Sequence, residues 1–236
     1  MMRKQMAKRV IPDFQEGKGE ELVTLTRRAS LASDRYRMLF AKVDQLCRTP
    51  EKKLIALTSS IKGEGKTTTT ANLAIVAARD FGKRCLIIDG DFKNPTLAKK
   101  FAMPEESGLI DVIEGRVQLG NALKRGPVEN LAILPMGRRS GKENNIWTTE
   151  EIKHVLTEVR AWFDYIWIDA PPILPLFDMS FISDSVDGTL IVVRAGEVPE
   201  QVLAQAIKSL GSSKIIGSVL NRAKMDWPSR YYEYGY

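Results

Sequence analysis

The sequence predicts an α/β domain with a doubly wound, mostly parallel sheet that carries helices on both faces. Short apolar runs alternate with longer segments of helical periodicity along most of the 236 residues. The apolar runs are continuous rather than alternating with polar residues, which indicates strands that are buried on both faces. The chain is long enough for one well-buried domain of this kind and too short for two.

The first expected elements lie between residues 30 and 82. From Ser30 onwards, apolar residues recur at steps of three and four, which predicts a helix that Pro50 stops. Residues 53–59 form a short apolar run and predict a buried strand. Residues 67–81 predict a helix that ends near Gly82.

The same alternation continues to the end of the domain. Further strands are expected at 84–91, 131–135, 165–169, 189–194 and 214–221. Further helices are expected at 148–163 and 199–210. The first of these helices opens with a capping box formed by Thr148 and Glu151. No internal repeat and no low-complexity linker interrupts this series.

The chain divides into three parts by composition. Residues 1–29 have weak periodicity and are expected to form a basic, flexible arm, because Arg3, Lys4, Lys8 and Arg9 fall within the first ten residues. The whole chain has a net charge of +6, and this arm could be attracted to an anionic membrane or nucleic acid, but so short a run favours a solvated tail. Residues 30–226 form the domain, and residues 227–236 form a tyrosine-rich tail.

Several functional classes are excluded by composition. No apolar segment approaches the roughly 20 residues that a membrane span needs, and the basic N-terminus lacks the apolar run of a secretory signal. Cys47 and Cys85 are isolated, which argues against a disulfide or zinc framework and for a reducing cytoplasm. His154 is the one histidine and is expected on a helix surface, so a catalytic or metal role for it is not expected.

Residues 60–67, "SIKGEGKT", match the phosphate-binding Walker A pattern, although Ser60 stands where glycine or alanine usually opens it. The glycines allow backbone N–H groups to turn towards phosphate, and the following helix points its N-terminus at the anion. Lys66 is expected to bind the β- and γ-phosphates of ATP, and Thr67 to ligate Mg²⁺. The expected nucleotide contacts are Ser60, Ile61, Lys62, Gly63, Glu64, Gly65, Lys66, Thr67 and Thr68. Because the motif follows a strand and opens a helix, a chance glycine-rich turn is a poor alternative.

Two more expected strands end in carboxylates: Asp89 and Asp91 follow one, and Asp169 follows another. The C-terminal ends of parallel strands face the same crevice, so these side chains should meet the phosphate loop. A single such aspartate is as often a cap or turn residue, but three beside a Walker A motif indicate a Mg²⁺ site. A nucleotide hydrolase of this P-loop fold needs one such acid, best matched by Asp169. The extra pair suggests a group that orients Mg²⁺ through water and takes a proton from an attacking hydroxyl.

The acidic pair also carries a family resemblance. "LIIDGDFKNPTL" resembles the Walker A′ motif of the bacterial tyrosine kinases, deviant-Walker P-loop enzymes that partner polysaccharide co-polymerases in capsule and exopolysaccharide export. "TSSIKGEGKTTTTANLA" is similar to their Walker A and "FDYIWIDAPPILPLFD" to their Walker B. "GLIDVIEG", "NLAILPMG" and "GSVLNR" follow in the family's order, so the resemblance covers roughly residues 30–236.

This resemblance implies a role for each matching residue. Lys66 and Thr67 would bind the ATP phosphates and Mg²⁺, and Asp91 and Asp169 would hold the metal directly or through water. Asp89 would be the general base, although two adjacent carboxylates titrate together and leave the choice within the pair open. The resemblance also places the adenine near two residues at the end of the last strand, Asn221 and Arg222.

The C-terminal tail supplies the expected phosphate acceptors. Four of the 6 tyrosines fall within the last six residues, namely Tyr231, Tyr232, Tyr234 and Tyr236. A solvated tail gains little from phenols, and the cluster resembles the family's tyrosine cluster, which is autophosphorylated between subunits. Packing of these rings on a neighbouring surface is the structural alternative.

Two segments depart from the family's pattern. Lys93 stands where the family usually has arginine, which keeps the charge but loses the bidentate fork. The family's oligomerisation motif ExxRxxR aligns best with Asp34, Arg37 and Phe40, so its second arginine is absent. The motif that assembles several copies through this helix in the family is therefore incomplete here.

The resemblance also implies partners and a location. With no membrane span expected, the chain is similar to the separate-chain form of the kinase, which is cytoplasmic and recruited to the inner face of the cell membrane. A membrane-embedded polysaccharide co-polymerase would act as its adaptor, other copies of the chain as substrates, and a cognate tyrosine phosphatase as its counterpart. No nucleic acid is expected as a partner.

Two other functions remain open from the residues. A switch ATPase of the chromosome-partitioning or division-site type shares the deviant P-loop, but Lys62 lies one residue away from the position of its signature lysine, and such proteins lack a tyrosine tail. An ATP-binding regulator of polysaccharide chain length, without catalysis, is the other. The complete set of acids favours the kinase over both.

Overall fold

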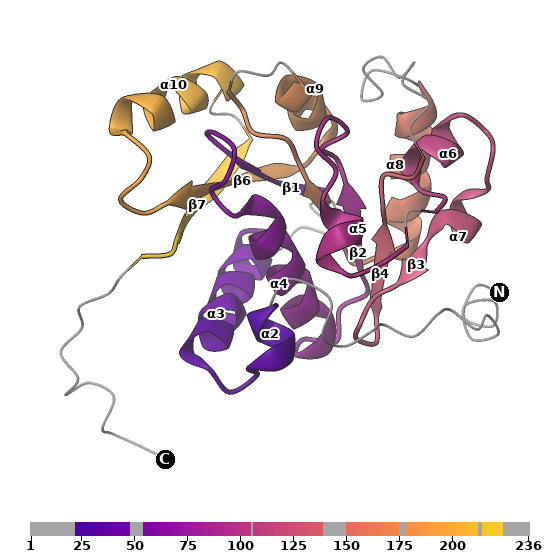
Figure 1. The fold of residues 1–236 in the computed structure, drawn as a ribbon, viewed down its shortest axis with the longest axis horizontal. Helices are drawn as coiled ribbons and strands as arrows, with labels where there is room; N and C mark the ends of the chain where they lie inside the picture. Colours follow the sequence, from indigo (N-terminus) through magenta and orange to yellow (C-terminus); the bar gives the residue numbers. More distant parts are fainter. Residues whose placement is uncertain are drawn as a thin grey trace.

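The computed structural model describes residues 22–47, 54–104, 106–138, 150–174, 178–211 and 214–223. Its centre is a seven-stranded sheet in the order β3-β4-β2-β5-β1-β6-β7 (Figure 1). All pairings are parallel except that of β3 with β4. The strands are β1 (Leu54–Ser59), β2 (Cys85–Asp89), β3 (Lys124–Arg125), β4 (Leu131–Leu134), β5 (Tyr165–Asp169), β6 (Gly188–Arg194) and β7 (Ile215–Asn221). The predicted doubly wound, mostly parallel α/β fold is confirmed.

Helices connect these strands on both sides of the sheet. They are α2 (Val23–Thr26), α3 (Leu31–Leu46), α4 (Lys66–Arg79), α5 (Leu97–Lys100), α6 (Leu109–Ile113), α7 (Leu119–Ala122), α8 (Glu150–Trp162), α9 (Asp178–Ser185) and α10 (Glu200–Leu210). The sequence predicted the long helices α3, α4, α8 and α10. It missed α2, α5, α6, α7 and α9, which are too short to show a helical period, and the two-residue strand β3.

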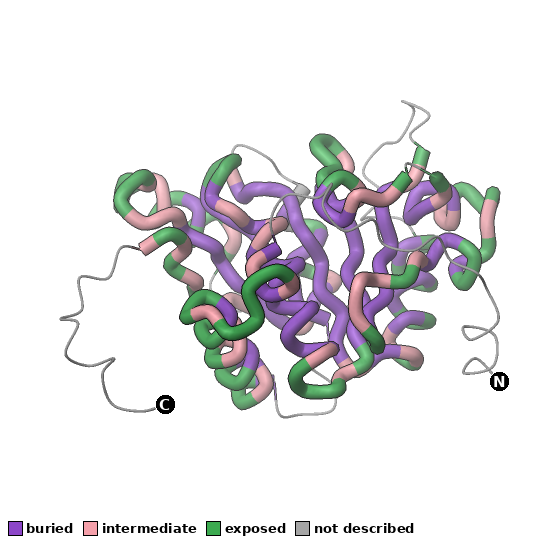
Figure 2. Tube along the Cα trace, turned by 60° about the horizontal axis from the view of Figure 1, so that its bottom comes forward, coloured by how far each residue is buried: buried purple, intermediate pink, exposed green. Residues whose placement is uncertain are grey.

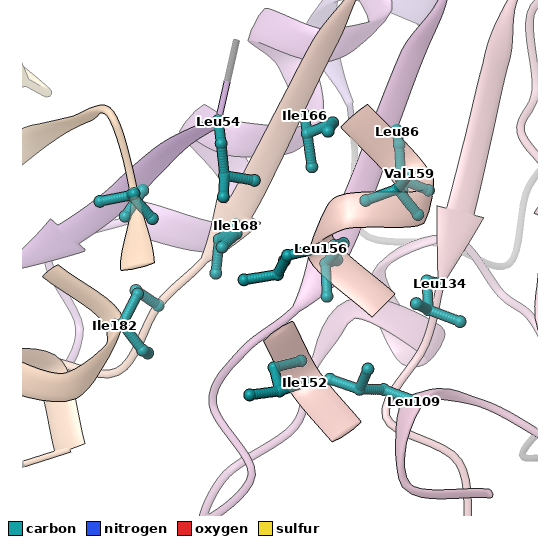
Figure 3. Close-up of a cluster of buried hydrophobic side chains, with 14 of the residues drawn as sticks. Leu54, Leu86, Leu109, Leu134, Ile152, Leu156, Val159, Ile166, Ile168 and Ile182 are labelled. Carbon is teal, nitrogen blue, oxygen red and sulfur yellow. The ribbon is translucent and has the colours of Figure 1, made fainter. Parts of the chain in front are cut away.

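Two apolar layers hold the helices to the sheet. Alternate residues of β1 point to opposite faces, so Leu54 and Ala56 join one cluster and Ile55 and Leu57 the other. The first cluster includes residues of α8 and α9, and Figure 3 shows the side chains of both helices beside those of β1, β2 and β5. The second includes residues of α3 and α4. Each fully buried leucine or isoleucine contributes roughly 1.5–3 kcal/mol, which makes this core the main source of stability.

The packed part of the chain begins earlier than the predicted boundary at residue 30. Leu22 is buried, and the backbone N–H and hydroxyl of Thr24 both donate to Asn72 Oδ1 of α4, at 3.0 and 2.7 Å. The assignment of all of residues 1–29 to a flexible arm is therefore wrong for 22–29. Its cause is that one apolar anchor and one buried polar pair hold this segment without any periodic pattern. Residues 1–21 and the tail at 227–236 lie outside the described residues.

Helix α3 begins as predicted after Ser30, whose hydroxyl accepts the backbone N–H of Ser33 at 3.3 Å. Arg37 is bound within the chain, to Asp34 at 2.6 Å and to Asp80, the residue that caps the C-terminus of α4, at 2.8 Å. Phe40 is fully buried in the core. The three residues that align with the oligomerisation motif therefore contact their own domain. The capping residue expected for α8, Thr148, lies outside the described residues.

Burial is highest in the middle of the sheet and falls towards its β7 edge (Figure 2). Every residue of β1, β2 and β5 is buried, as their continuous apolar runs predicted. β7 is at an edge and is only partly covered. Within the described residues, no helix combines the length and the apolar character that crossing a bilayer would require.

Candidate active site

The phosphate loop connects β1 to α4 at the C-terminal end of the central strands. Gly63 and Gly65 both have φ of +94°, a left-handed conformation that residues with a Cβ rarely adopt. A Cβ on Gly65 would also lie 2.2 Å from Asn221 Nδ2 of β7. The second glycine is thus required both by its backbone angle and by the close approach of β7.

Lys66, the first residue of α4, is almost completely buried among acids. Its Nζ lies 2.9 Å from Asp91 Oδ2 and 4.0 Å from Asp169 Oδ1. Burial alone lowers the pKa of the amine, but the charges of Asp169 and Asp91 outweigh it and raise the pKa of Lys66 above its ordinary value. The lysine therefore keeps its positive charge at the loop, as the motif predicted.

Thr67 and Asp169 form the second contact between the loop and the acids. The Thr67 hydroxyl donates to Asp169 Oδ2 at 2.7 Å. The other oxygen of this carboxylate, Oδ1, is buried and has no hydrogen-bond partner among the residues that the structure describes. Burial raises the pKa of Asp169, and the charge of Lys66 opposes the rise. An unpartnered buried carboxylate oxygen is costly unless a cation completes it.

Asp89 lies beside Asp169, because these two residues are paired in register between β2 and β5. Its carboxylate accepts the backbone N–H of Leu97 at 3.0 Å and that of Asp91 at 3.3 Å. Burial, together with the charge of Asp169, raises the pKa of Asp89 to about 8. The structure thus brings together all three acids that the sequence placed at one edge of the sheet.

The other residues that were predicted to contact the nucleotide differ from one another in exposure. Ile61 and Lys62 are exposed, and Thr68 is half-buried. The Ser60 hydroxyl is buried and has no hydrogen-bond partner within the described part of the chain. Arg222 is exposed and has φ of +57°. Their contact with a nucleotide stays a prediction. The four tail tyrosines lie outside the described residues.

The side chains of Glu64 and Asn221 are engaged within the protein. The Glu64 carboxylate accepts backbone N–H groups from Ile61 and from Arg194, the last residue of β6. Asn221 donates its side-chain amide to the carbonyl of Glu64. Both were predicted to touch the nucleotide, and both support the loop that would bind it.

Two residues of the site were missed from the sequence. The Thr96 hydroxyl lies 3.1 Å from that of Thr67, and the buried Lys100 of α5 has a charge that opposes the rise in the pKa of Asp169. Both follow the acidic pair in the short segment that leads into and through α5. A polar residue and a lysine just after a Walker A′ motif were the available signals, but neither has a diagnostic spacing.

These residues fit a magnesium nucleotide. Lys66 and the glycine-rich loop would hold the phosphates, and Thr67, Asp91 and Asp169 would hold the cation. No group of three or more His, Cys, Asp or Glu side chains within the described ranges is arranged to enclose a metal ion. A site with few protein ligands suits Mg²⁺, which keeps waters and uses substrate phosphates as ligands.

Comparisons with known sequences agree with this geometry. The AAA domain family matches residues 52–216. The chain is 30% identical over 217 residues to the tyrosine-protein kinase YwqD of Bacillus subtilis, covering 91% of this chain and 90% of that one. It is 28% identical over 210 residues to the succinoglycan biosynthesis transport protein ExoP of Rhizobium meliloti, covering 87% of this chain but only 27% of ExoP.

Solved structures give the same result. The BceF tyrosine kinase domain superposes with a TM-score of 0.78 at 26% identity, covering 86% of this chain and 83% of that one. The septum site-determining protein MinD of Pyrococcus horikoshii, complexed with Mg-ADP, superposes with a TM-score of 0.61 at 25% identity, covering 76% and 75%. The BceF kinase domain is thus matched more completely than MinD.

Proposed function

The chain belongs to the bacterial protein-tyrosine kinases, and we propose that it uses Mg·ATP to phosphorylate its own C-terminal tyrosines. The acceptors in this proposal are Tyr231, Tyr232, Tyr234 and Tyr236. One copy phosphorylates the tail of another.

One observation carries the proposal: the site has a carboxylate beyond those that engage the loop. Asp91 is paired with Lys66, and Asp169 holds Thr67. Asp89 lies beside them and accepts only backbone N–H groups among the hydrogen bonds of the described residues. Transfer to a phenol releases the proton of the attacking hydroxyl, and Asp89 is the carboxylate left to accept it.

The protein's own residues then divide the work. Bound Mg·ATP supplies the transferable phosphoryl group and the charge of the cation. Lys66 neutralises phosphate oxygens where negative charge develops, and Asp91, Asp169 and Thr67 hold the cation in place. Asp89 takes the proton of the tyrosine hydroxyl as that oxygen attacks the γ-phosphorus, and the bond from this phosphorus to the bridging oxygen breaks so that ADP leaves.

The place where β7 ends supports the role of the tail as substrate. β7 ends at Asn221, whose amide contacts the phosphate loop, so the chain leaves the sheet on the catalytic side. Tyr231 follows ten residues later. Ten extended residues span at most roughly 33–36 Å, a length that allows Tyr231 to reach the site of a neighbouring copy.

The cellular part of the proposal follows from the relatives. YwqD is named as a tyrosine-protein kinase and ExoP as a succinoglycan biosynthesis transport protein. We place the chain in capsule or exopolysaccharide synthesis, at the inner face of the cell membrane. A membrane-embedded polysaccharide co-polymerase recruits and activates it, and a tyrosine phosphatase reverses the modification.

Mixing two complementary variants tests transfer between copies. The donor carries an intact site and phenylalanine at all four tail tyrosines, and the acceptor carries Lys66→Ala with an intact tail. With Mg·ATP, we expect phosphotyrosine on the acceptor in the mixture and none when either variant is incubated alone. Tags of different mass identify the labelled chain.

Two outcomes would count against the proposal. A labelled wild-type tail with an unlabelled acceptor in the mixture would mean transfer within one copy. A labelled acceptor in the absence of the donor would mean that Lys66 is not needed for the reaction.

A further inference from the structure

The phosphate loop contains a buried acid that the reaction does not use. Glu64 is 2% exposed, and its Oε1 accepts the N–H of Ile61 at 2.7 Å while its Oε2 accepts the N–H of Arg194 at 3.0 Å. A negative charge in an anion-binding loop repels the ligand, so its presence there has to be offset by another contribution. Here the carboxylate joins the loop to the end of β6.

A second contact joins the same residue to β7. Asn221 Nδ2 donates to the backbone carbonyl of Glu64 at 2.9 Å. This nitrogen occupies the space that a Cβ on Gly65 would need. Arg194 and Asn221 are paired in register at the ends of β6 and β7, and Ala195 N donates to Asn221 O at 2.9 Å. The loop and the ends of the two strands thus form one closed set of hydrogen bonds.

We propose that Glu64 and Asn221 are positioning residues that fix the phosphate loop to β6 and β7 and so couple nucleotide binding to the end of β7. Hydrogen bonds to a buried charge are stronger than neutral ones and fix the geometry of the groups that make them. Part of the order of the loop is therefore present before the phosphates arrive, and less of the binding free energy is used to complete it.

The coupling follows from the position of β7. β7 is an edge strand whose one neighbour in the sheet is β6. Leu220, which precedes Asn221 in the chain, is 63% exposed. If nucleotide binding stabilises the loop in this arrangement, it stabilises the end of β7, and the reverse effect is equal in free energy. The further consequence, that the state of the C-terminal tail affects nucleotide affinity, rests on the proposed function.

Glu64→Gln tests the positioning role with little change in shape. The Gln amide group can accept only one of the two N–H groups and presents its own donors to the other. We expect the Kd for Mg·ADP, measured by calorimetry on the full chain, to rise about 10-fold. Glu197→Gln is the matched control, because the Glu197 carboxylate contacts the guanidinium of Arg194, at 2.6 Å, and not the backbone N–H of Arg194. It should change the Kd by no more than about twofold.

Amide hydrogen exchange distinguishes the positioning role of Glu64 from a role in stabilising the fold alone. In the wild type, Mg·ADP should slow amide exchange at Ile61, at Arg194 and at the end of β7. In Glu64→Gln, the slowing at β7 should be lost while slowing in α4 remains. If Glu64→Gln does not fold, Asn221→Ala replaces it, and exchange at Ile61 and Arg194 should speed up without any nucleotide.

A variant that combines Glu64→Gln with Asn221→Ala completes the test. Because both residues hold the same segment of the loop, their effects on exchange at Ile61 should be less than additive. Equal effects of Glu64→Gln and Glu197→Gln on the Kd, or slowing at β7 that persists in Glu64→Gln, would overturn the proposal. These measurements need no phosphate transfer, so they stand apart from any failure of the kinase proposal.

Discussion

The two ends of the central sheet treat their carboxylates in opposite ways: those at one end are partly exposed and paired, and those at the other are buried. At the N-terminal end, the Asp187 carboxylate accepts hydrogen bonds from both terminal nitrogens of Arg160, at 2.6 and 2.8 Å. It also accepts one from the backbone N–H of Leu54. Asp164 is likewise matched by Arg84, through its side chain and its backbone N–H. At the C-terminal end, the charges are not matched in this way.

At that catalytic end, three carboxylates surround one loop lysine, and one oxygen of Asp169 has no hydrogen bond among the described residues. The pKa of Asp89 and that of Asp169 are raised by burial. One end of the sheet thus has paired charges that stabilise the fold, and the other keeps unpaired charge for an incoming cation. Substitutions at the two ends should therefore have opposite effects on stability and activity.

The largest effect is expected from Lys66→Ala, which removes the cation of the catalytic end. The rate of phosphotyrosine formation should fall roughly 10³-fold or more, because charge stabilisation in a dry site is lost. Lys208→Ala, an exposed lysine on α10, is the control and should leave the rate unchanged. A similar loss in both variants would contradict a specific role for Lys66.

Asp187→Ala is the matching change at the other end. It leaves Arg160 and the Leu54 N–H without this acceptor, so the free energy of unfolding should fall by about 2 kcal/mol. For a domain of this size, the Tm should fall by roughly 4–8 °C. Activity per folded molecule should not change. Asp184→Ala, at an exposed position of α9, provides the comparison by thermal unfolding, and an equal loss there would argue against the pairing as the cause.

Asp169→Asn should give the opposite result. A neutral side chain of the same shape relieves the buried charge, so the Tm without nucleotide or Mg²⁺ should rise by roughly 2–4 °C. Activity should fall at the same time, and Mg·ADP should no longer raise the Tm as it does in the wild type. A lower Tm in this variant would mean that the charge of Asp169 stabilises the fold.

The effect of pH on the protein without metal or nucleotide is the most gradual, because it is spread over several pH units. A raised pKa means that the folded state favours the protonated acid, so the contribution of Asp89 is present below about pH 4 and is lost as the pH rises towards 8. Urea unfolding across this range should show a fall of at most about 1.4 kcal/mol per pH unit from this group. Asp89→Asn should reduce that fall.

Asp111 is the control with the opposite sign. Burial alone would raise its pKa, but the backbone N–H groups of Gly108 and Arg138 and the guanidinium of Arg116 lower it. Its contribution is therefore present above the ordinary carboxyl pKa of about 4 and lost as the pH falls further. Asp111→Asn should change only the acid limb of the profile. An unchanged profile in both variants would contradict these assignments.

The catalytic end could be predicted because its pattern is local. Apolar runs identify parallel strands, parallel strands carry their C-terminal residues to one edge, and Asp89, Asp91 and Asp169 follow such runs directly. The contacts that the sequence did not show join distant residues: Thr24 and Asn72 are 48 residues apart, and Glu64 and Arg194 are 130 apart. Nothing in the local pattern of Glu64 distinguishes a support of the loop from a ligand of the nucleotide.

The most direct test of the central claim is mass spectrometry of residues 231–236 after incubation of the full chain with Mg·ATP. We predict phosphate on these tyrosines in the wild type and none in Lys66→Ala or Asp89→Asn. Phosphate released to water while the wild-type tail stays unmodified, or a Lys66→Ala tail labelled as fully as the wild type, would contradict the assignment of this site to tyrosine phosphorylation.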